Sequence, residues 1–165
     1  LFFFEFLIIS GDVSFLFIGE KSLSDPSKEP ECASEALFYV KRQSDMSSFF
    51  SVVDLVVTRG GASTLAELAA LGIPAVVVPW LGAAGNHQEL NARSLTDAGA
   101  AVMVLEKELT GERLAKEVVA LMDPERRRQM EKSAGSLGRP EAAREIIDVL
   151  VEMSRQKWGP DGRKA

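Results

Sequence analysis

The chain has 165 residues, of which 46% are hydrophobic and 26% are charged, a composition that supports one globular domain and excludes wholesale disorder. Its formal net charge of -5 provides no overall positive field for phosphate backbones, which argues against nucleic acid as a partner. The single cysteine, Cys32, cannot form an internal disulfide, which fits a reducing, cytoplasmic location.

Six short apolar runs predict the strands of a buried sheet. They cover residues 1–10, 15–18, 36–40, 55–58, 75–78 and 101–105. The first run contains Glu5 and is too short for a membrane-spanning helix, which needs about 20 apolar residues. Because the runs are continuously apolar rather than alternating, they indicate a parallel sheet that is covered by helices on both faces.

Segments with helical spacing lie between and after these runs. The predicted helices cover residues 44–52, 63–71, 87–98, 111–122, 124–137 and 140–153. Strands that alternate with helices through short Gly or Pro connections predict the α/β class, with a Rossmann-like, doubly wound parallel sheet. In such a sheet, ligands bind at the carboxyl ends of the strands.

The last predicted helix carries an apolar stripe on an acidic background. This pattern favours packing on the domain, or on a neighbour, over contact with a membrane. Residues 154–165 are predicted to form a flexible tail. The expected organisation is therefore one ligand-binding domain over residues 1–153, in which residues 1–35 are atypical, followed by this tail.

The most informative stretch joins the strand at 55–58 to the next helix through Arg59, Gly60 and Gly61. Glycines let the backbone approach a ligand closely, and the N–H groups at the start of a helix attract an anion such as a phosphate. Glu67, a turn further on, can accept hydrogen bonds from both hydroxyls of a ribose. The alternative is a capping box, in which Thr64 caps the helix and Glu67 bonds back to its start.

A second polar cluster follows the next strand. A loop of small residues leads into a helix whose first turns contain Asn86, His87, Gln88 and Asn91. These side chains offer many directional donors and acceptors to a polyhydroxylated ligand. The alternative is again structural, with Asn86 as the helix cap and Glu89 as its partner in a capping box.

Several chemical motifs are missing from the sequence. It has no Asp-x-Asp motif, no pair of histidines at ligand spacing and no Cys-x-x-Cys, so neither a protein-bound metal nor another cofactor is expected. The G-x-S-x-G motif of many hydrolases is missing as well. The charge of a bound diphosphate would therefore be met by backbone N–H groups, by the helix end and by Arg59.

Three segments together resemble the C-terminal domain of the MurG family, the bacterial family 28 glycosyltransferases. They are residues 54–68 (DLVVTRGGASTLAEL), 86–92 (NHQELNA) and 97–101 (DAGAA), within a match from about residue 38 to residue 151. The resemblance implies the GT-B fold, of which this chain supplies the donor-binding half. It also implies an inverting hexosyltransferase that moves GlcNAc from UDP-GlcNAc to lipid I, forming lipid II for peptidoglycan, cell shape and cell division.

The resemblance further implies which residues bind the donor. They are Gln43, Arg59, Gly61, Ala62, Ser63, Thr64, Leu65, Ala66, Glu67, His87, Gln88 and Asn91. Residues 62–67 would wrap the sugar and the diphosphate, with Glu67 on the ribose hydroxyls, Gln88 and His87 on the GlcNAc and phosphate, and Gln43 near the uracil. No catalytic residue is expected here, because the family places its general base in an N-terminal domain that this chain lacks.

The expected partners follow from the same resemblance. They are UDP-GlcNAc, and a lipid-linked acceptor that is bound through the N-terminal domain at the cytoplasmic face of the plasma membrane, where the full-length enzyme is peripheral. This chain alone is expected to bind the donor weakly and to transfer nothing. Two alternatives stay open: the soluble catalytic subunit of a split lipid-linked GlcNAc transferase, and a non-catalytic nucleotide-sugar-binding fragment, which the unusual segment 1–35 favours.

Overall fold

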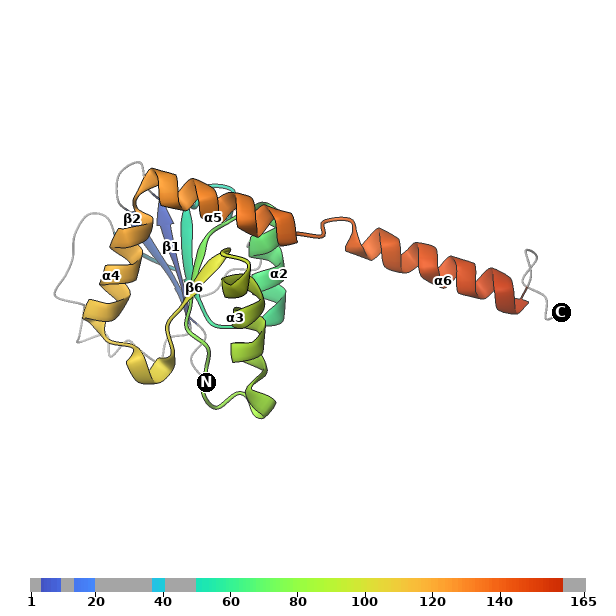
Figure 1. Cartoon of the computed structure of the whole chain (residues 1–165), viewed down its shortest axis with the longest axis horizontal. Coiled ribbons are helices and arrows are strands. Elements are labelled where there is room, and N and C mark those ends of the chain that lie inside the picture. The colour runs from blue at the N-terminus through green and yellow to red at the C-terminus, as the bar shows by residue number, and fades with distance from the viewer. Residues whose placement is uncertain (1–3, 10–13, 20–36, 41–49, 159–165) are drawn as a thin grey trace.

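The computed structural model describes residues 4–9, 14–19, 37–40 and 50–158, which form one six-stranded sheet, helices packed against it and a last helix that projects away (Figure 1). The strands are β1 (Phe4–Ile9), β2 (Ser14–Gly19), β3 (Leu37–Val40), β4 (Leu55–Thr58), β5 (Ala75–Val77) and β6 (Ala101–Met103). Their order across the sheet is β3-β2-β1-β4-β5-β6. Each strand predicted from the sequence is present, and the α/β class is confirmed.

The direction of β1 departs from the predicted parallel arrangement. Strand pairs β2–β3, β4–β5 and β5–β6 are parallel, whereas β1 runs antiparallel to both β2 and β4. Only residues 10–13 join β1 to β2, and a parallel crossover needs about a dozen residues or more. The part of the sheet that carries the predicted ligand motifs, β4 to β6, is parallel throughout.

The helices are α2 (Ala62–Leu71), α3 (His87–Asp97), α4 (Gly111–Leu121), α5 (Pro124–Leu137) and α6 (Ala142–Trp158), with short 3-10 turns η2 (Ala84–Asn86) and η3 (Glu106–Glu108). Five predicted helices are thus confirmed, while most of the one predicted at 44–52 lies outside the described residues.

Two helix ends are fixed by the residues at their caps. The Thr110 hydroxyl accepts from the Arg113 amide at the start of α4, and Gly72, with a φ of 69°, ends α2.

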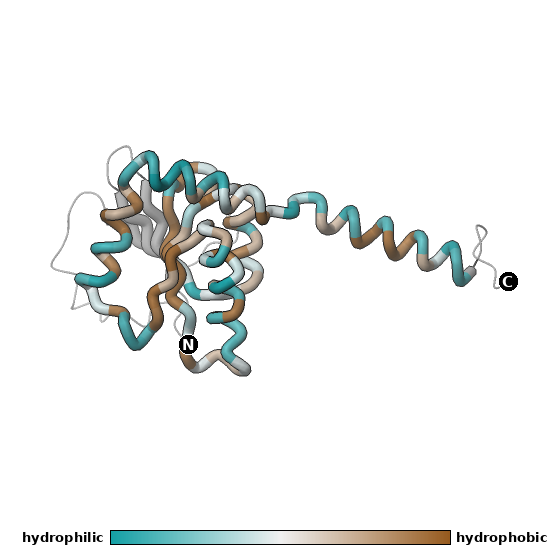
Figure 2. Tube along the Cα trace, viewed as in Figure 1, coloured by the Kyte–Doolittle hydropathy of each residue, from teal (hydrophilic) through white to brown (hydrophobic). Residues whose placement is uncertain are grey.

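The core lies on both faces of the strands, which is why the strand sequences are continuously apolar. Val56 points into a cluster with residues of α2 and α3, whereas its neighbours Leu55 and Val57 point into a second cluster with residues of α4 and α5. All three side chains are at most 2% exposed. In Figure 2 the hydrophobic colour accordingly concentrates along the central strands.

Helix α6 projects away from the rest of the chain (Figure 1). Its side chains from 143 to 157 are all exposed, including the apolar Ile146, Ile147 and Leu150. The predicted packing of this stripe on the domain is therefore not found. The helix also continues past Met153 to Trp158, so the start of the predicted flexible tail is helical. No helix among the described residues is long and apolar enough to cross a membrane.

Candidate functional site

The carboxyl ends of β4, β5 and β6 meet at one edge of the sheet, because these strands are parallel. Arg59, Gly60 and Gly61, here called the glycine loop, follow β4. The loop at 78–83 follows β5, and η3 follows β6. Both polar motifs that the sequence singled out therefore lie at the edge where parallel sheets bind their ligands.

The N-cap residue of α2 is a glycine, which makes no side-chain cap hydrogen bond. Gly61 is the N-cap, with extended backbone angles of -68° and 129°, and the first bond of the helix joins the Leu65 amide to the Gly61 carbonyl at 3.0 Å. The first amides of any helix point beyond its internal hydrogen bonds, so this end carries partial positive charge. Thr64 lies inside the helix rather than at its cap, and the capping-box alternative for Glu67 is therefore wrong.

The first turn of α3 packs directly onto the glycine loop. A Cβ atom at Gly60 would lie 2.2 Å from the Gln88 carbonyl oxygen and 2.8 Å from the Gln88 carbonyl carbon. Only glycine permits this approach of two backbones. The Asn91 side chain donates to the Gly60 carbonyl at 3.0 Å, which ties the helix to the loop. The amino ends of α2 and α3 thus lie next to each other.

Gln88 also holds the loop that follows β5. Its side-chain oxygen accepts a hydrogen bond from the Trp80 amide at 3.0 Å, and the side chain is half-buried. One residue thereby contacts the glycine loop through its backbone and the 78–83 loop through its side chain. The position of Gln88 is therefore fixed from two sides.

Asn86 and His87 are exposed at the start of α3. Asn86 occupies the N-cap position with a φ of 55°, and its amide nitrogen donates to Glu89 at 2.8 Å instead of its oxygen capping the helix. The predicted capping box is therefore wrong, because the Asn86 side chain accepts no bond from the helix backbone. An N-cap side chain makes that bond when its own backbone is extended, whereas the Asn86 backbone is left-handed. His87 Nδ1 lies 2.7 Å from the Ala84 carbonyl, a contact that needs the proton on Nδ1.

Glu89 belongs to a small charged network on the exposed side of α3. The pKa of the Glu89 carboxyl is lowered most by the hydrogen bond from Asn86 and next by the one from Arg93, because both bonds favour the charged form of the carboxyl. Arg93 Nη2 lies 2.6 Å from Glu89 Oε1, and the carboxylate raises the pKa of the Arg93 guanidinium. This network stabilises the amino end of α3 without reaching the glycine loop.

Arg59 forms an ion pair that the sequence did not reveal. Its Nη1 lies 3.0 Å from Glu106 Oε1 and donates to the Val78 carbonyl at 3.3 Å, while the side chain is only 14% exposed. The second Glu106 oxygen accepts from the Leu81 amide at 3.0 Å. The sequence could have indicated this pair only through the positions of the two residues, since Glu106 follows β6 and Arg59 follows β4 at the same edge of the sheet.

The remaining predicted residues lie along α2. Leu65 is 2% exposed and points into the core, whereas Ala66 and Glu67 are exposed. A shallow groove of about 290 Å³ runs between α2 and α3. It is lined by Ala62, Leu65, Ala66, Ala69, Asn91, Ser94, Leu95 and Leu137. Gln43, predicted near the uracil, lies outside the described residues.

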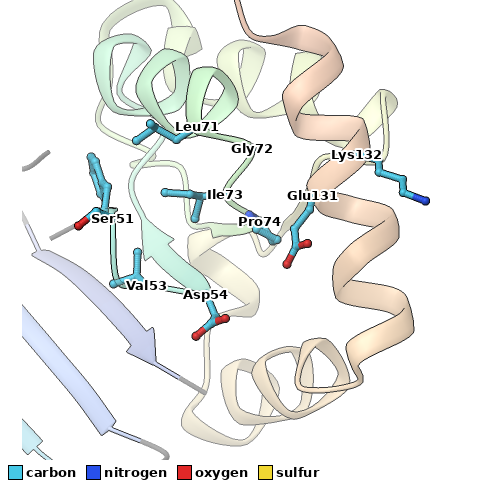
Figure 3. A pocket seen from close by; sticks show the side chains of 10 residues that line it. Ser51, Val53, Asp54, Leu71, Gly72, Ile73, Pro74, Glu131 and Lys132 are labelled. Carbon is cyan, nitrogen blue, oxygen red and sulfur yellow. The ribbon is translucent and has the colours of Figure 1, made fainter. Parts of the chain in front are cut away.

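A larger groove of about 580 Å³ lies at the opposite edge of the sheet. Asp54 and Pro74, which line it, come immediately before β4 and β5, so this amino-edge groove lies at the amino ends of the strands (Figure 3). Arg127 Nη2 lies 3.6 Å from Asp54 Oδ1, and Arg127 Nε lies 3.5 Å from Glu131 Oε1. Both acidic side chains that line this groove therefore form ion pairs with Arg127. Figure 3 shows Lys132 pointing away from the groove. The described residues contain no group of His, Cys, Asp and Glu that could hold a metal ion.

Comparison with known proteins shows which family the chain belongs to. Residues 4–148 match the model of the glycosyltransferase family 28 C-terminal domain. The chain belongs to this family. The family 28 match begins at residue 4 and so includes β1 and β2, which the sequence had set apart as atypical.

Two relatives and one solved structure show how much of a family 28 enzyme the chain represents. The UDP-N-acetylglucosamine--N-acetylmuramyl-(pentapeptide) pyrophosphoryl-undecaprenol N-acetylglucosamine transferase of Anaeromyxobacter sp. (strain K) is 55% identical over 116 residues, which are 70% of this chain and 30% of the relative. The transferase of the same name from Myxococcus xanthus (strain DK1622) is 54% identical over 121 residues, or 73% and 32% of the two chains.

The crystal structure of Acinetobacter baumannii MurG matches with a TM-score of 0.66 and 32% identity, over 71% of this chain and 35% of that one. The resemblance drawn from the three segments is confirmed by these matches. The chain spans about one third of the length of the proteins that it matches.

Proposed function

We propose that this chain is the donor-binding half of an inverting transferase that moves GlcNAc from UDP-GlcNAc to lipid I, forming lipid II for peptidoglycan. The observation that carries the proposal is the amino end of α2, which begins at a glycine N-cap and lies against the first turn of α3 at the carboxyl edge of the sheet. A diphosphate at this position would receive N–H groups from the glycine loop and the first turn of α2. The names of the curated relatives support the choice of donor and acceptor.

The proposed reaction is a direct displacement at the anomeric carbon. The acceptor hydroxyl oxygen forms the new bond to this carbon while the bond to the diphosphate oxygen breaks, and UDP leaves with the electron pair. Negative charge on the diphosphate therefore grows as the bond breaks, and the fixed N–H dipoles at the start of α2 stabilise it most at that moment. The base that takes the hydroxyl proton is assigned to the part of the relatives that this chain does not match.

The positions of the side chains support the proposed binding roles. Glu67 is exposed one turn beyond the amino end of α2, where its carboxylate would accept from the ribose hydroxyls. Gln88 uses its side-chain oxygen on the Trp80 amide, and its Nε2 group is assigned to the sugar. His87 is exposed beside it. Gln43 as a uracil contact and Arg59 as a phosphate contact stay predictions.

The charge of the diphosphate is assigned to main-chain donors and not to a protein-bound metal, which likewise stays a prediction. In the whole enzyme, the lipid-linked acceptor would bring this domain to the cytoplasmic face of the plasma membrane as part of a peripheral protein. The residues that match the relatives cover about one third of the relatives' length, and the donor-binding role alone is proposed for them.

Titration calorimetry with UDP-GlcNAc tests the proposal. Because hydrogen bonds to a charged group contribute about 1.5–3 kcal/mol, Glu67→Ala is expected to weaken binding roughly 10- to 100-fold. Glu112→Ala, at an exposed glutamate in the first turn of α4, is the matched control and should bind like the wild type. Equal binding by Glu67→Ala and the wild type would remove Glu67 from the site, and no binding by the wild type would overturn the proposed function.

A further inference from the structure

We propose that Glu106 is a positioning residue for the sugar end of the donor site. It would act by holding the 78–83 loop in the conformation that orients Gln88. The inference rests on the proposed function, because it takes Gln88 as the residue that meets the sugar.

The two oxygens of Glu106 have separate partners on the other two strand ends. Oε1 lies 3.0 Å from Nη1 of Arg59, which follows β4, and Oε2 accepts from the amide of Leu81, in the loop after β5. Glu106 itself follows β6. One carboxylate thus joins the three strand ends that form the candidate site, although it is 30% exposed and lies on a short 3-10 turn.

The ion pair gives Arg59 a structural task. Its Nη1 also donates to the Val78 carbonyl, so the guanidinium bridges Glu106 and the end of β5. Only 14% of the Arg59 side chain is exposed, and the Glu106 carboxylate and the Val78 carbonyl both restrain it. We therefore expect Glu106 both to fix the loop and to keep Arg59 directed at Val78.

The loop passes this restraint to Gln88. Leu81 is bound by Glu106, and the adjacent Trp80 donates its amide to the Gln88 side chain at 3.0 Å. If the loop moves, the Gln88 side-chain oxygen loses its partner, and the amide group can rotate. The effect should therefore appear where Gln88 acts, at the sugar, and much less at the diphosphate that α2 binds.

The test compares UDP-GlcNAc with UDP as ligands of the full 165-residue chain. Loss of one hydrogen bond predicts that Glu106→Ala binds UDP-GlcNAc about three- to tenfold more weakly, with a change of less than about twofold for UDP. Gln88→Ala should show the same selective loss, and the double variant should be no weaker than Gln88→Ala alone, because both residues act through one contact. Glu108→Ala, on the same turn and exposed, is the matched control and should bind both ligands like the wild type.

A weakening of both ligands to the same extent, or additive losses in the double variant, would overturn the inference. Glu106→Gln provides a rescue, since its amide oxygen can still accept from Leu81, and it should bind UDP-GlcNAc more tightly than Glu106→Ala. A Glu106→Gln variant as weak as Glu106→Ala would contradict the role of the Leu81 bond.

A second measurement needs no ligand and separates this inference from the proposed function. Amide hydrogen exchange should become faster at both Leu81 and Trp80 in Glu106→Ala. Unchanged exchange at Trp80 would overturn the link to Gln88, whatever the chain binds. Failure of the wild type to bind UDP-GlcNAc would instead overturn the proposed function, while the exchange result would still decide whether Glu106 holds the loop.

Discussion

Replacing Gly60 by alanine tests the contact that brings the two motifs together. The added Cβ would lie 2.2 Å from the Gln88 carbonyl oxygen, 2.8 Å from its carbon and 2.9 Å from the Gln88 Cβ. Two of these three atoms belong to the backbone of α3, so no flexible side chain can move aside. Either α3 shifts away from the glycine loop or the loop itself distorts, and the Asn91 bond to the Gly60 carbonyl is lost in both cases.

The expected cost follows from overpacking. Forcing a methyl group into a close-packed contact lowers the free energy of unfolding by about 1–3 kcal/mol, which for a chain of this size lowers Tm by roughly 3–10 °C. Gly61→Ala is the matched control. An added Cβ meets nothing within 4 Å at Gly61, whose φ of -68° suits alanine, so its unfolding free energy should change by less than about 0.5 kcal/mol.

Urea denaturation followed by circular dichroism measures both variants under the same conditions. Gly60→Ala should unfold at a lower urea midpoint with an unchanged slope, because the surface exposed on unfolding stays the same. A Gly60→Ala variant as stable as Gly61→Ala would show that α3 does not contact the glycine loop, and the geometry of the candidate site would be wrong.

Three further changes test the core, the end of α5 and the acid response. Leu68→Ala, at a fully buried position, should lower the unfolding free energy by about 2–5 kcal/mol. Leu71→Ala, at an exposed position of the same helix, should lower it by less than about 0.5 kcal/mol, and similar urea midpoints for the two would contradict the core. Gly138→Ala would place a Cβ 2.6 Å from a carbonyl oxygen of α2 and should also lower the unfolding free energy by about 1–3 kcal/mol. An unchanged unfolding free energy would contradict the packing of the end of α5 on α2. A hydrogen bond from Asn86 holds the pKa of Glu89 below its ordinary 4.5, so the charged carboxylate stabilises the fold fully above that pH and the stabilisation is lost as the pH falls below it. Between about pH 6 and about pH 3, the Tm of Glu89→Gln should therefore fall less than that of the wild type. An identical fall in Tm for the two proteins would exclude this contribution.

Much of the fold could be predicted because burial on both faces makes β4, β5 and β6 continuously apolar. The direction of β1 could not be read from its apolar residues, since an antiparallel strand in a covered sheet is equally apolar. It depends on the short connection at 10–13, which excludes a crossover helix. The extension of α6 to Trp158 was missed because the apolar stripe ends at Met153, although the residues that follow are compatible with a helix.

The candidate site was predictable where local sequence determines geometry. Paired glycines after a buried strand predicted a helix that begins beside them, and in the structure Gly61 is the N-cap of α2. Glu106 was missed because its partners, Leu81 and Arg59, are close only after the strands align. Leu81 lies 25 positions earlier in the chain, and no short motif relates the two residues.

We propose that the diphosphate of the donor binds at the amino end of α2. Titration of the nitrogen-15-labelled chain with UDP-GlcNAc, followed by amide chemical shifts, tests it most directly. The amides of residues 61–64 and of Gln88 should shift most, with the amides of Gly72 and Ile73 unchanged. Shifts concentrated at Gly72 and Ile73, in the amino-edge groove of Figure 3, would place the ligand at the wrong edge of the sheet and contradict the account.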